Sequence, residues 1–136
     1  MDTQQTKIKL YDRQEKTTTT MFVQRISDNV FRMIDNDAFN CKLTRGTEFE
    51  TKINEEGDHE ILRIIKKSDF ITRRFVLTIE TNQTDYLFLG QELTKNGGFW
   101  QVDFGGIATV NIPPDKVAVV DKVMRDLNLN LTELTE

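Results

Sequence analysis

Alternating apolar and polar positions mark short strands in the first half of the chain. Phe49 and Ile53 share one face at even spacing, and a run of threonines leads into the apolar residues Met21, Phe22 and Val23. A period of two is typical of strands, whose successive side chains point to opposite faces. Between turn signals we expect strands at residues 18–26, 30–34, 47–53 and 59–67, and an edge strand at residues 7–11.

The strand at residues 59–67 carries the densest apolar run of this half. We predict that it is well buried on the evidence of four aliphatic residues, Ile61, Leu62, Ile64 and Ile65.

The pattern changes in the second half, where strand and helix periods alternate. Residues 73–80 alternate as a strand does, and residues 84–96 carry apolar side chains three and four positions apart, as a helix does. A hairpin is expected over residues 99–112, with Gly105 and Gly106 at its turn. Within it, Trp100 is either an exposed binding anchor or part of the core, and we favour the core.

A last helix is expected from Pro113 to about Leu127, since proline fits the first helical turn and the following apolar residues form one stripe. Residues 129–136 should be a frayed or extended tail.

These elements predict one α+β domain spanning residues 1–136. An N-terminal antiparallel β-meander (residues 18–68) is followed by a strand–helix–strand–strand–helix half (residues 73–127), with two helices packed on a sheet. The strand at residues 59–67 is a candidate to join that sheet. No glycine- or proline-rich linker separates the halves, so we expect one cooperative unit with peripheral residues 1–16 and 129–136.

Composition changes this picture only by exclusion. The 136 residues are 38% hydrophobic and 29% charged, a globular balance, and a single cysteine, Cys41, cannot form an internal disulfide. We expect a cytoplasmic protein because neither a signal sequence nor an apolar run of about 20 residues is present. The net charge of −4 disfavours a nucleic-acid partner and is compatible with a basic protein partner.

Residue types that could carry catalysis are few. His59 could be a general base or a metal ligand, but we favour a surface residue at a strand start, because no nucleophile lies near it in sequence. Cys41 could pair with His59, although a buried apolar role is the alternative we favour. Asp35 and Asp37 could bind a divalent cation, yet both are common turn residues. We therefore expect no metal and no cofactor.

The basic residues concentrate around one predicted strand junction. Such a cluster could bind a phosphorylated ligand, nucleic acid or an acidic partner, or could be a solvated strand end. Its members, the candidate binding residues of this chain, are Arg63, Lys66, Lys67, Arg73 and Arg74.

Several short segments resemble a bacterial family of unknown function. Arg32, Asp35, Asn36 and Phe39 are similar to its R-x-x-D-N-x-x-F segment, and the step that begins at Gly46 is similar to its G-D-x-V step, with a departure at Thr47. Ser68 followed by Arg73 to Leu77 resembles its S-x-x-x-x-R-V step. The resemblance spans residues 22–127 and implies a two-part α+β domain, but no activity, cofactor or site residue.

The leading hypothesis is a non-enzymatic protein-binding module, such as a small acidic inhibitor or an immunity protein that neutralises a toxin. The alternative is a sensor or carrier of a small anionic ligand, held by the basic cluster. A third, less favoured, is an enzyme that uses Asp35 and Asp37 with Glu48 or Glu50. The oligomeric state is left open.

Overall fold

The computed structural model describes residues 4–37, 40, 42–77, 83–104, 106–127 and 132–134. The chain divides into two units, Met1–Ser68 and Asp69–Glu136, and each is described by itself. Cys41, Gly105 and the end of the strand predicted over residues 73–80 lie outside the described residues, so those predictions stay predictions. Within the described ranges, no helix is long and apolar enough to cross a membrane.

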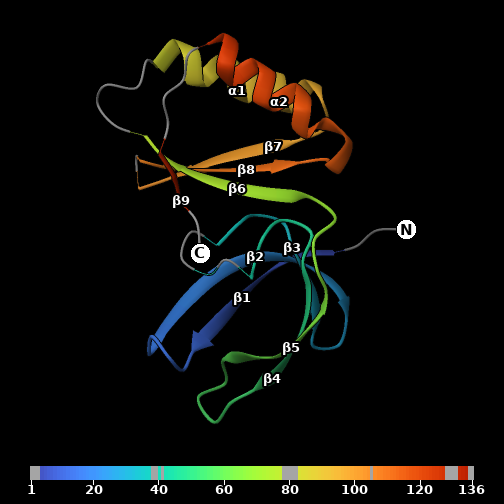
Figure 1. Ribbon diagram of the computed structural model, residues 1–136. Coiled ribbons are helices and arrows are strands. Elements are labelled where there is room, and N and C mark those ends of the chain that lie inside the picture. Colours follow the sequence, from blue (N-terminus) through green and yellow to red (C-terminus); the bar gives the residue numbers. More distant parts are fainter. Residues whose placement is uncertain are drawn as a thin grey trace. The chain divides into compact units, whose positions relative to one another are not determined.

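The first unit is a closed barrel of five strands joined in sequence order (Figure 1). Its strands are β1 (Gln4–Asp12), β2 (Thr17–Ser27), β3 (Val30–Met33), β4 (Glu48–Ile53) and β5 (His59–Lys66). Each is antiparallel to the next, and one parallel pair, Leu10 opposite His59, closes β1 onto β5. The predicted edge strand at residues 7–11 is in fact this longer β1, paired along its whole length with β2.

Inward-facing residues of the strands fill the barrel. Phe31 on β3 and Phe49 on β4 are fully buried, with ring centroids 6.0 Å apart. Removing such a ring from water contributes about 1.5–3 kcal/mol. The other buried apolar residues of this core are Ile8, Leu10, Met21, Val23, Met33 and Leu43.

Strand β5 is less buried than its apolar run predicts. Its pairing with β4 shifts register twice, and each shift leaves one extra residue on β5, first Leu62 and then Ile65. A bulge of this kind disrupts the alternation of faces. Ile61 and Ile64 therefore pack against the core, whereas Leu62 is 55% exposed and Ile65 is 47% exposed.

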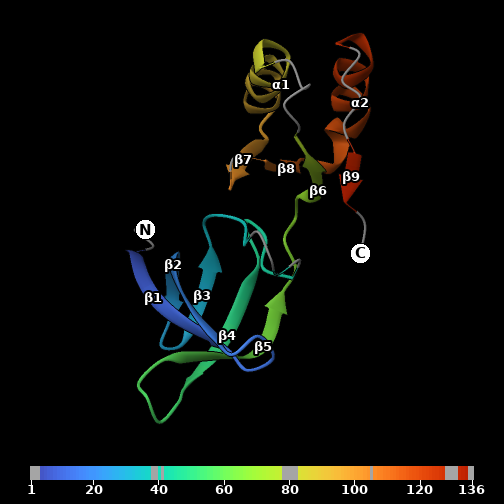
Figure 2. The ribbon, with the colours of Figure 1, turned by 90° about the vertical axis from the view of Figure 1, so that its left-hand side faces the viewer.

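The second unit is an antiparallel four-stranded sheet with two helices on one face, as both views show (Figures 1 and 2). The strand order is β7-β8-β6-β9. Its elements are β6 (Ile71–Val76), α1 (Gln83–Lys95), β7 (Phe99–Asp103), β8 (Ile107–Ile112), a 3-10 turn (Pro114–Lys116), α2 (Val117–Asp126) and β9 (Thr132–Leu134).

The core of the second unit lies between the helices and the sheet. Leu89 and Leu93 of α1 and Val120 of α2 pack there against buried residues of β6 and β8. Trp100 packs against the same cluster, as expected from the sequence. It lies so close to α1 that a Cβ added at Gly90 would be 2.2 Å from the indole ring.

The predicted α+β class is confirmed, including the meander and the two helices packed on a sheet. Other details differ from the prediction. Residues 4–12, expected to be peripheral, form the barrel strand β1, with Ile8 and Leu10 in the core. Strand β5 pairs with β4 and β1 rather than with the second sheet. In the predicted tail, residues 132–134 form β9, which pairs with β6 and is fixed by ion pairing of Arg73 with Glu133. A single cooperative domain stays a prediction.

Candidate functional site

A groove of about 750 Å³ lies at one end of the barrel, between the turn that joins β1 to β2 and the turn that joins β4 to β5. We call it the barrel-end groove. Carboxylates outnumber cations in its lining, and Tyr11, Thr18, Ile53 and Asn54 complete it. The charged residues of the lining are Glu55, Glu56, Asp58, Glu60, Arg13 and Lys52.

The β4–β5 turn is shaped by the side chain of Asn54. Its Oδ1 accepts hydrogen bonds from the backbone N–H groups of Glu56 (3.0 Å) and Asp58 (2.9 Å). The backbone N–H of Asn54 also donates to the carbonyl of Asp58, at 2.8 Å, and Gly57 adopts a φ of 84°, which favours glycine. The turn therefore holds its acidic residues at the rim of the groove.

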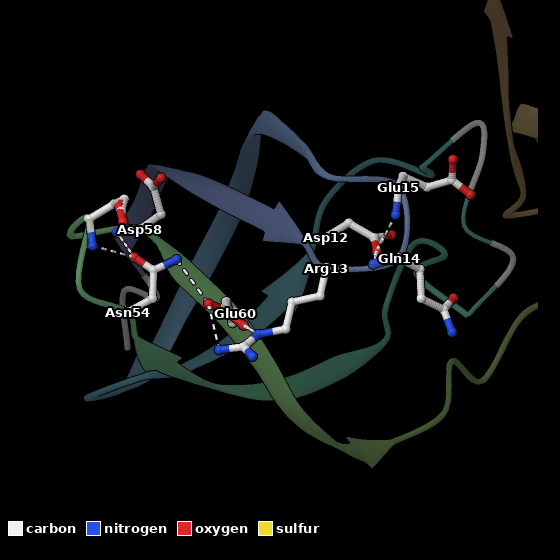
Figure 3. A network of polar contacts seen from close by, with 8 residues as sticks. Asp12, Arg13, Gln14, Glu15, Asn54, Asp58 and Glu60 are labelled. Carbon is white, nitrogen blue, oxygen red and sulfur yellow. Dashed lines mark hydrogen bonds and ion pairs between the residues drawn. The ribbon is translucent and has the colours of Figure 1, made fainter.

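The β1–β2 turn is shaped in a similar way by Asp12. Its Oδ1 accepts from the backbone N–H groups of Gln14 (2.8 Å) and Glu15 (3.2 Å), a turn that aspartate commonly stabilises (Figure 3). Arg13 is the first residue of this turn, and its side chain extends away from it towards β5 (Figure 3).

Among the residues that the structure describes, Glu60 is the one charged residue that is buried, with 5% of its surface exposed. Its carboxylate accepts from Arg13 through Nε and, at 3.5 Å, through Nη2, and from Asn54 Nδ2 at 2.9 Å. Figure 3 shows both side chains converging on this carboxylate. The hydrogen bond from Arg13, followed by that from Asn54, lowers the pKa of Glu60, so the carboxylate stays ionised at neutral pH.

A second cavity of about 460 Å³ adjoins the first, and we call it the seam cavity. Tyr11, Arg13 and Glu60 line both cavities. The seam cavity follows β5 beyond the Leu10–His59 pair that closes the barrel, and Ile61 and Ile64 belong to its lining. The Arg13–Glu60 ion pair thus lies where the two cavities meet.

The acidity of the barrel-end groove is local to it. The first unit carries twelve basic and twelve acidic residues, so it has no formal net charge. The second unit carries six basic and ten acidic residues and therefore accounts for the net charge of −4. The groove combines four carboxylates with two cations inside a neutral unit.

The basic cluster predicted from the sequence divides between the units. Arg63, Lys66 and Lys67 belong to the first unit, and Arg73 and Arg74 to the second. Arg63 pairs with Glu50 at 2.7 Å, and Lys66 and Lys67 are exposed.

In the second unit, Arg74 is half-buried on β6, and Arg73 lies between two carboxylates. Arg73 pairs with Asp121 of α2 at 2.6 Å and with Glu133 of β9 at 2.8 Å. These hydrogen bonds raise the pKa of Arg73 further above its usual value. Arg73 and Arg63 thus have carboxylate partners within the chain, and the binding role of the cluster stays a prediction.

His59 begins β5 as predicted, but it is half-buried rather than a surface residue. Its Nδ1 lies 2.7 Å from Thr51 Oγ1, and its ring meets Phe31 edge-on at 5.1 Å. Burial, then the positive charge of Arg25, lowers the pKa of His59, and Asp58 opposes this shift.

Asp37, Glu48 and Glu50, three of the four carboxylates of the enzyme hypothesis, also have local partners. Asp37 accepts from the backbone N–H of Asn40 at 3.2 Å, as a turn residue does. On β4, Glu48 pairs with Arg32 and Glu50 pairs with Arg63. No group of three or more histidine, cysteine, aspartate or glutamate side chains that could hold a metal occurs in the described part of the chain.

Arg13 and Glu60 are missed by sequence analysis because 47 positions separate them. Only the turn beside them, residues 54–58, has a local signal, since Asn, Gly and Asp are typical turn residues.

The fold and the groove define a two-unit α+β protein with an acidic groove at the end of a small barrel. No protein-family model matches the chain, and no curated protein matches its sequence. In structure it is similar to a hypothetical protein from Neisseria gonorrhoeae, with a TM-score of 0.63 and 16% sequence identity. The similarity covers 98% of this chain and 95% of that one, and at this identity it shows a shared fold.

Proposed function

We propose that this chain is a non-enzymatic protein-binding module, and that the barrel-end groove receives a positively charged segment of its partner. The observation that carries the proposal is the groove itself, where carboxylates outnumber cations in a cavity of about 750 Å³. Complementary charge across an interface speeds encounter and selects among partners.

The build of the groove supports recognition of a partner's side chains. Its rim acids are carried by a turn whose backbone is fixed by Asn54, so they are positioned before the partner arrives. Preorganised groups lose less conformational freedom when they bind. A basic target enzyme, as an immunity-type inhibitor would have, is one partner of the required chemistry.

The anionic-ligand alternative has weaker support. It relies on cationic side chains that are free to meet an anion, whereas Arg63 and Arg73 already pair with carboxylates of this chain. A ligand would have to compete with those contacts.

Charge reversal at the rim tests the proposal. The bait is the full chain, and the assay is a pull-down from the native host followed by titration of the purified partner. We expect Glu55→Lys with Glu56→Lys to weaken binding about tenfold or more and to flatten its salt dependence. The matched control, Glu15→Lys with Asp28→Lys, makes the same charge change at exposed positions that do not line the groove. If both pairs of substitutions weakened partner binding equally, net charge alone would explain the effect, and the groove would be refuted as the binding site.

A further inference from the structure

The Arg13–Glu60 ion pair is unusual in how unequally its partners are exposed. The side chain of Glu60 is 7% exposed, whereas that of Arg13 is 71% exposed. The carboxylate is therefore fixed inside the protein, and Asn54 holds it from a second direction. The guanidinium reaches it from solvent at the end of a flexible side chain, so the arginine is the partner that can leave.

Departure of Arg13 would also change the shape of the surface. The barrel-end groove and the seam cavity share Arg13, Glu60 and Tyr11 in their linings. With the arginine side chain swung out, they would join over Glu60 as one longer groove. The turn itself need not move, because Asp12 holds its backbone independently of the Arg13 side chain.

We infer that Glu60 is a binding site for the guanidinium group of an arginine side chain on the partner, and that Arg13 occupies this site until that arginine replaces it. The partner as the source of the arginine rests on the proposed function. The site itself rests on the buried carboxylate and the two cavities.

The burial of Glu60 decides the charge of the ligand. A neutral group that displaced Arg13 would leave the Glu60 carboxylate without its ion-pair partner, with Asn54 as its remaining hydrogen-bond donor and Lys52 as the nearby positive charge, which is unfavourable. An incoming cation restores the pair, so one cation exchanges for another at little net cost. Neutral and acidic segments do not restore the ion pair, so the site favours a cation.

The contact that Arg13 makes decides which cation fits best. Its Nε and Nη2 reach different oxygens of Glu60. A planar guanidinium offers two parallel donors of this kind, whereas the ammonium of lysine is a compact point charge. The site is therefore expected to prefer arginine to lysine.

The test uses the full chain and two peptides, Gly-Ser-Arg-Ser-Gly and its lysine counterpart. Binding of each peptide is measured by NMR from the shift of the side-chain amide resonance of Asn54. We expect Arg13→Ala to bind the arginine peptide about tenfold or more tightly than the wild type does, and more tightly than it binds the lysine peptide. Adding Glu60→Gln to Arg13→Ala should abolish binding. Equal affinity of the wild type and Arg13→Ala, or undiminished binding after Glu60→Gln, would overturn the inference.

The wild type provides a measurement that does not depend on how a variant folds. Excess arginine peptide should shift the Nε–H resonance of Arg13 towards that of a free arginine, whereas a resonance that stays in place at saturation refutes the exchange. If the rim reversal at Glu55 and Glu56 weakens partner binding but Arg13→Ala leaves it unchanged, the inference fails and the proposed function stands. If the peptides behave as expected but Glu55→Lys with Glu56→Lys does not weaken partner binding, the proposed function fails and the guanidinium site stands.

Discussion

Substitution of Gly90 by alanine has two opposite effects on the free energy of unfolding. The packing around Gly90 decides whether the net change stabilises or destabilises the protein. Gly90 lies inside α1, where alanine is the better helix former by about 1 kcal/mol. Helix propensity alone therefore predicts that Gly90→Ala stabilises the protein.

Packing predicts the opposite. The added Cβ would lie 2.2 Å from Trp100 Cε2 and 2.3 Å from Nε1, where ordinary contacts begin at 3.4 Å. The indole or the helix must therefore move by about 1 Å within a packed core, and such overpacking costs about 1–3 kcal/mol. Because Leu89 and Leu93 pack beside this contact, we take the upper part of that range and expect a net loss of about 1–2 kcal/mol.

Urea denaturation followed by far-ultraviolet circular dichroism measures this loss. Gln91→Ala, at an exposed position of the same helix, is the control and should change the midpoint little. In a Trp100→Leu background the penalty of Gly90→Ala should shrink or reverse, as a double-mutant cycle reveals. A Gly90→Ala protein at least as stable as the wild type would refute the packing argument.

Three further predictions concern stability. Arg73→Ala should cost about 1–2 kcal/mol and speed hydrogen exchange in β9, whereas Lys122→Ala, which removes an exposed pair, should cost less than about 0.5 kcal/mol in the same urea titration. Burial lowers the pKa of His59 in the folded protein from its ordinary value of 6.5, so the histidine contributes fully to stability above that pH and loses this contribution as the pH falls below it. We expect His59→Asn to remove this pH dependence from urea midpoints measured between about pH 7.5 and pH 5.5. Phe49→Ala should lower the free energy of unfolding of the barrel by about 3–5 kcal/mol. If the two units unfold together, as the sequence predicts, the unfolding transition seen by the fluorescence of Trp100 should shift as well. If that transition keeps its midpoint, the two units unfold independently.

The elements that sequence analysis located are those with an apolar period. Helix α1 is predicted at residues 84–96 and found at Gln83–Lys95, because its inward residues repeat every three or four positions. Strand β9 has no such signal, since all three of its residues are exposed and it is fixed by pairing with β6. Strand β1 is mostly polar, with Ile8 and Leu10 as its buried apolar residues.

The candidate site could not be predicted for a related reason. Local charge density identified Arg63 and Arg73, both of which pair with carboxylates within the chain. The burial of Glu60 follows from barrel closure by one residue pair, Leu10 with His59, which brings the end of β1 beside the start of β5. A contact between positions so distant in sequence leaves no local pattern.

Arg13 and Arg73 make comparable ion pairs but differ in what they allow. Arg73 is 23% exposed and lies between Asp121 and Glu133, which are 39% and 36% exposed, so the cation is the more buried partner. Removing the Arg73 side chain would break both ion pairs at once, as expected of a residue that links α2 to β9. At Glu60 the burial is reversed, since the acid is fixed and the arginine is exposed. In the proposed exchange a cation from outside takes the place of the exposed arginine at Glu60 while Asn54 keeps its contact with the carboxylate, and this asymmetry is why we propose recognition at the barrel end and a structural role for Arg73.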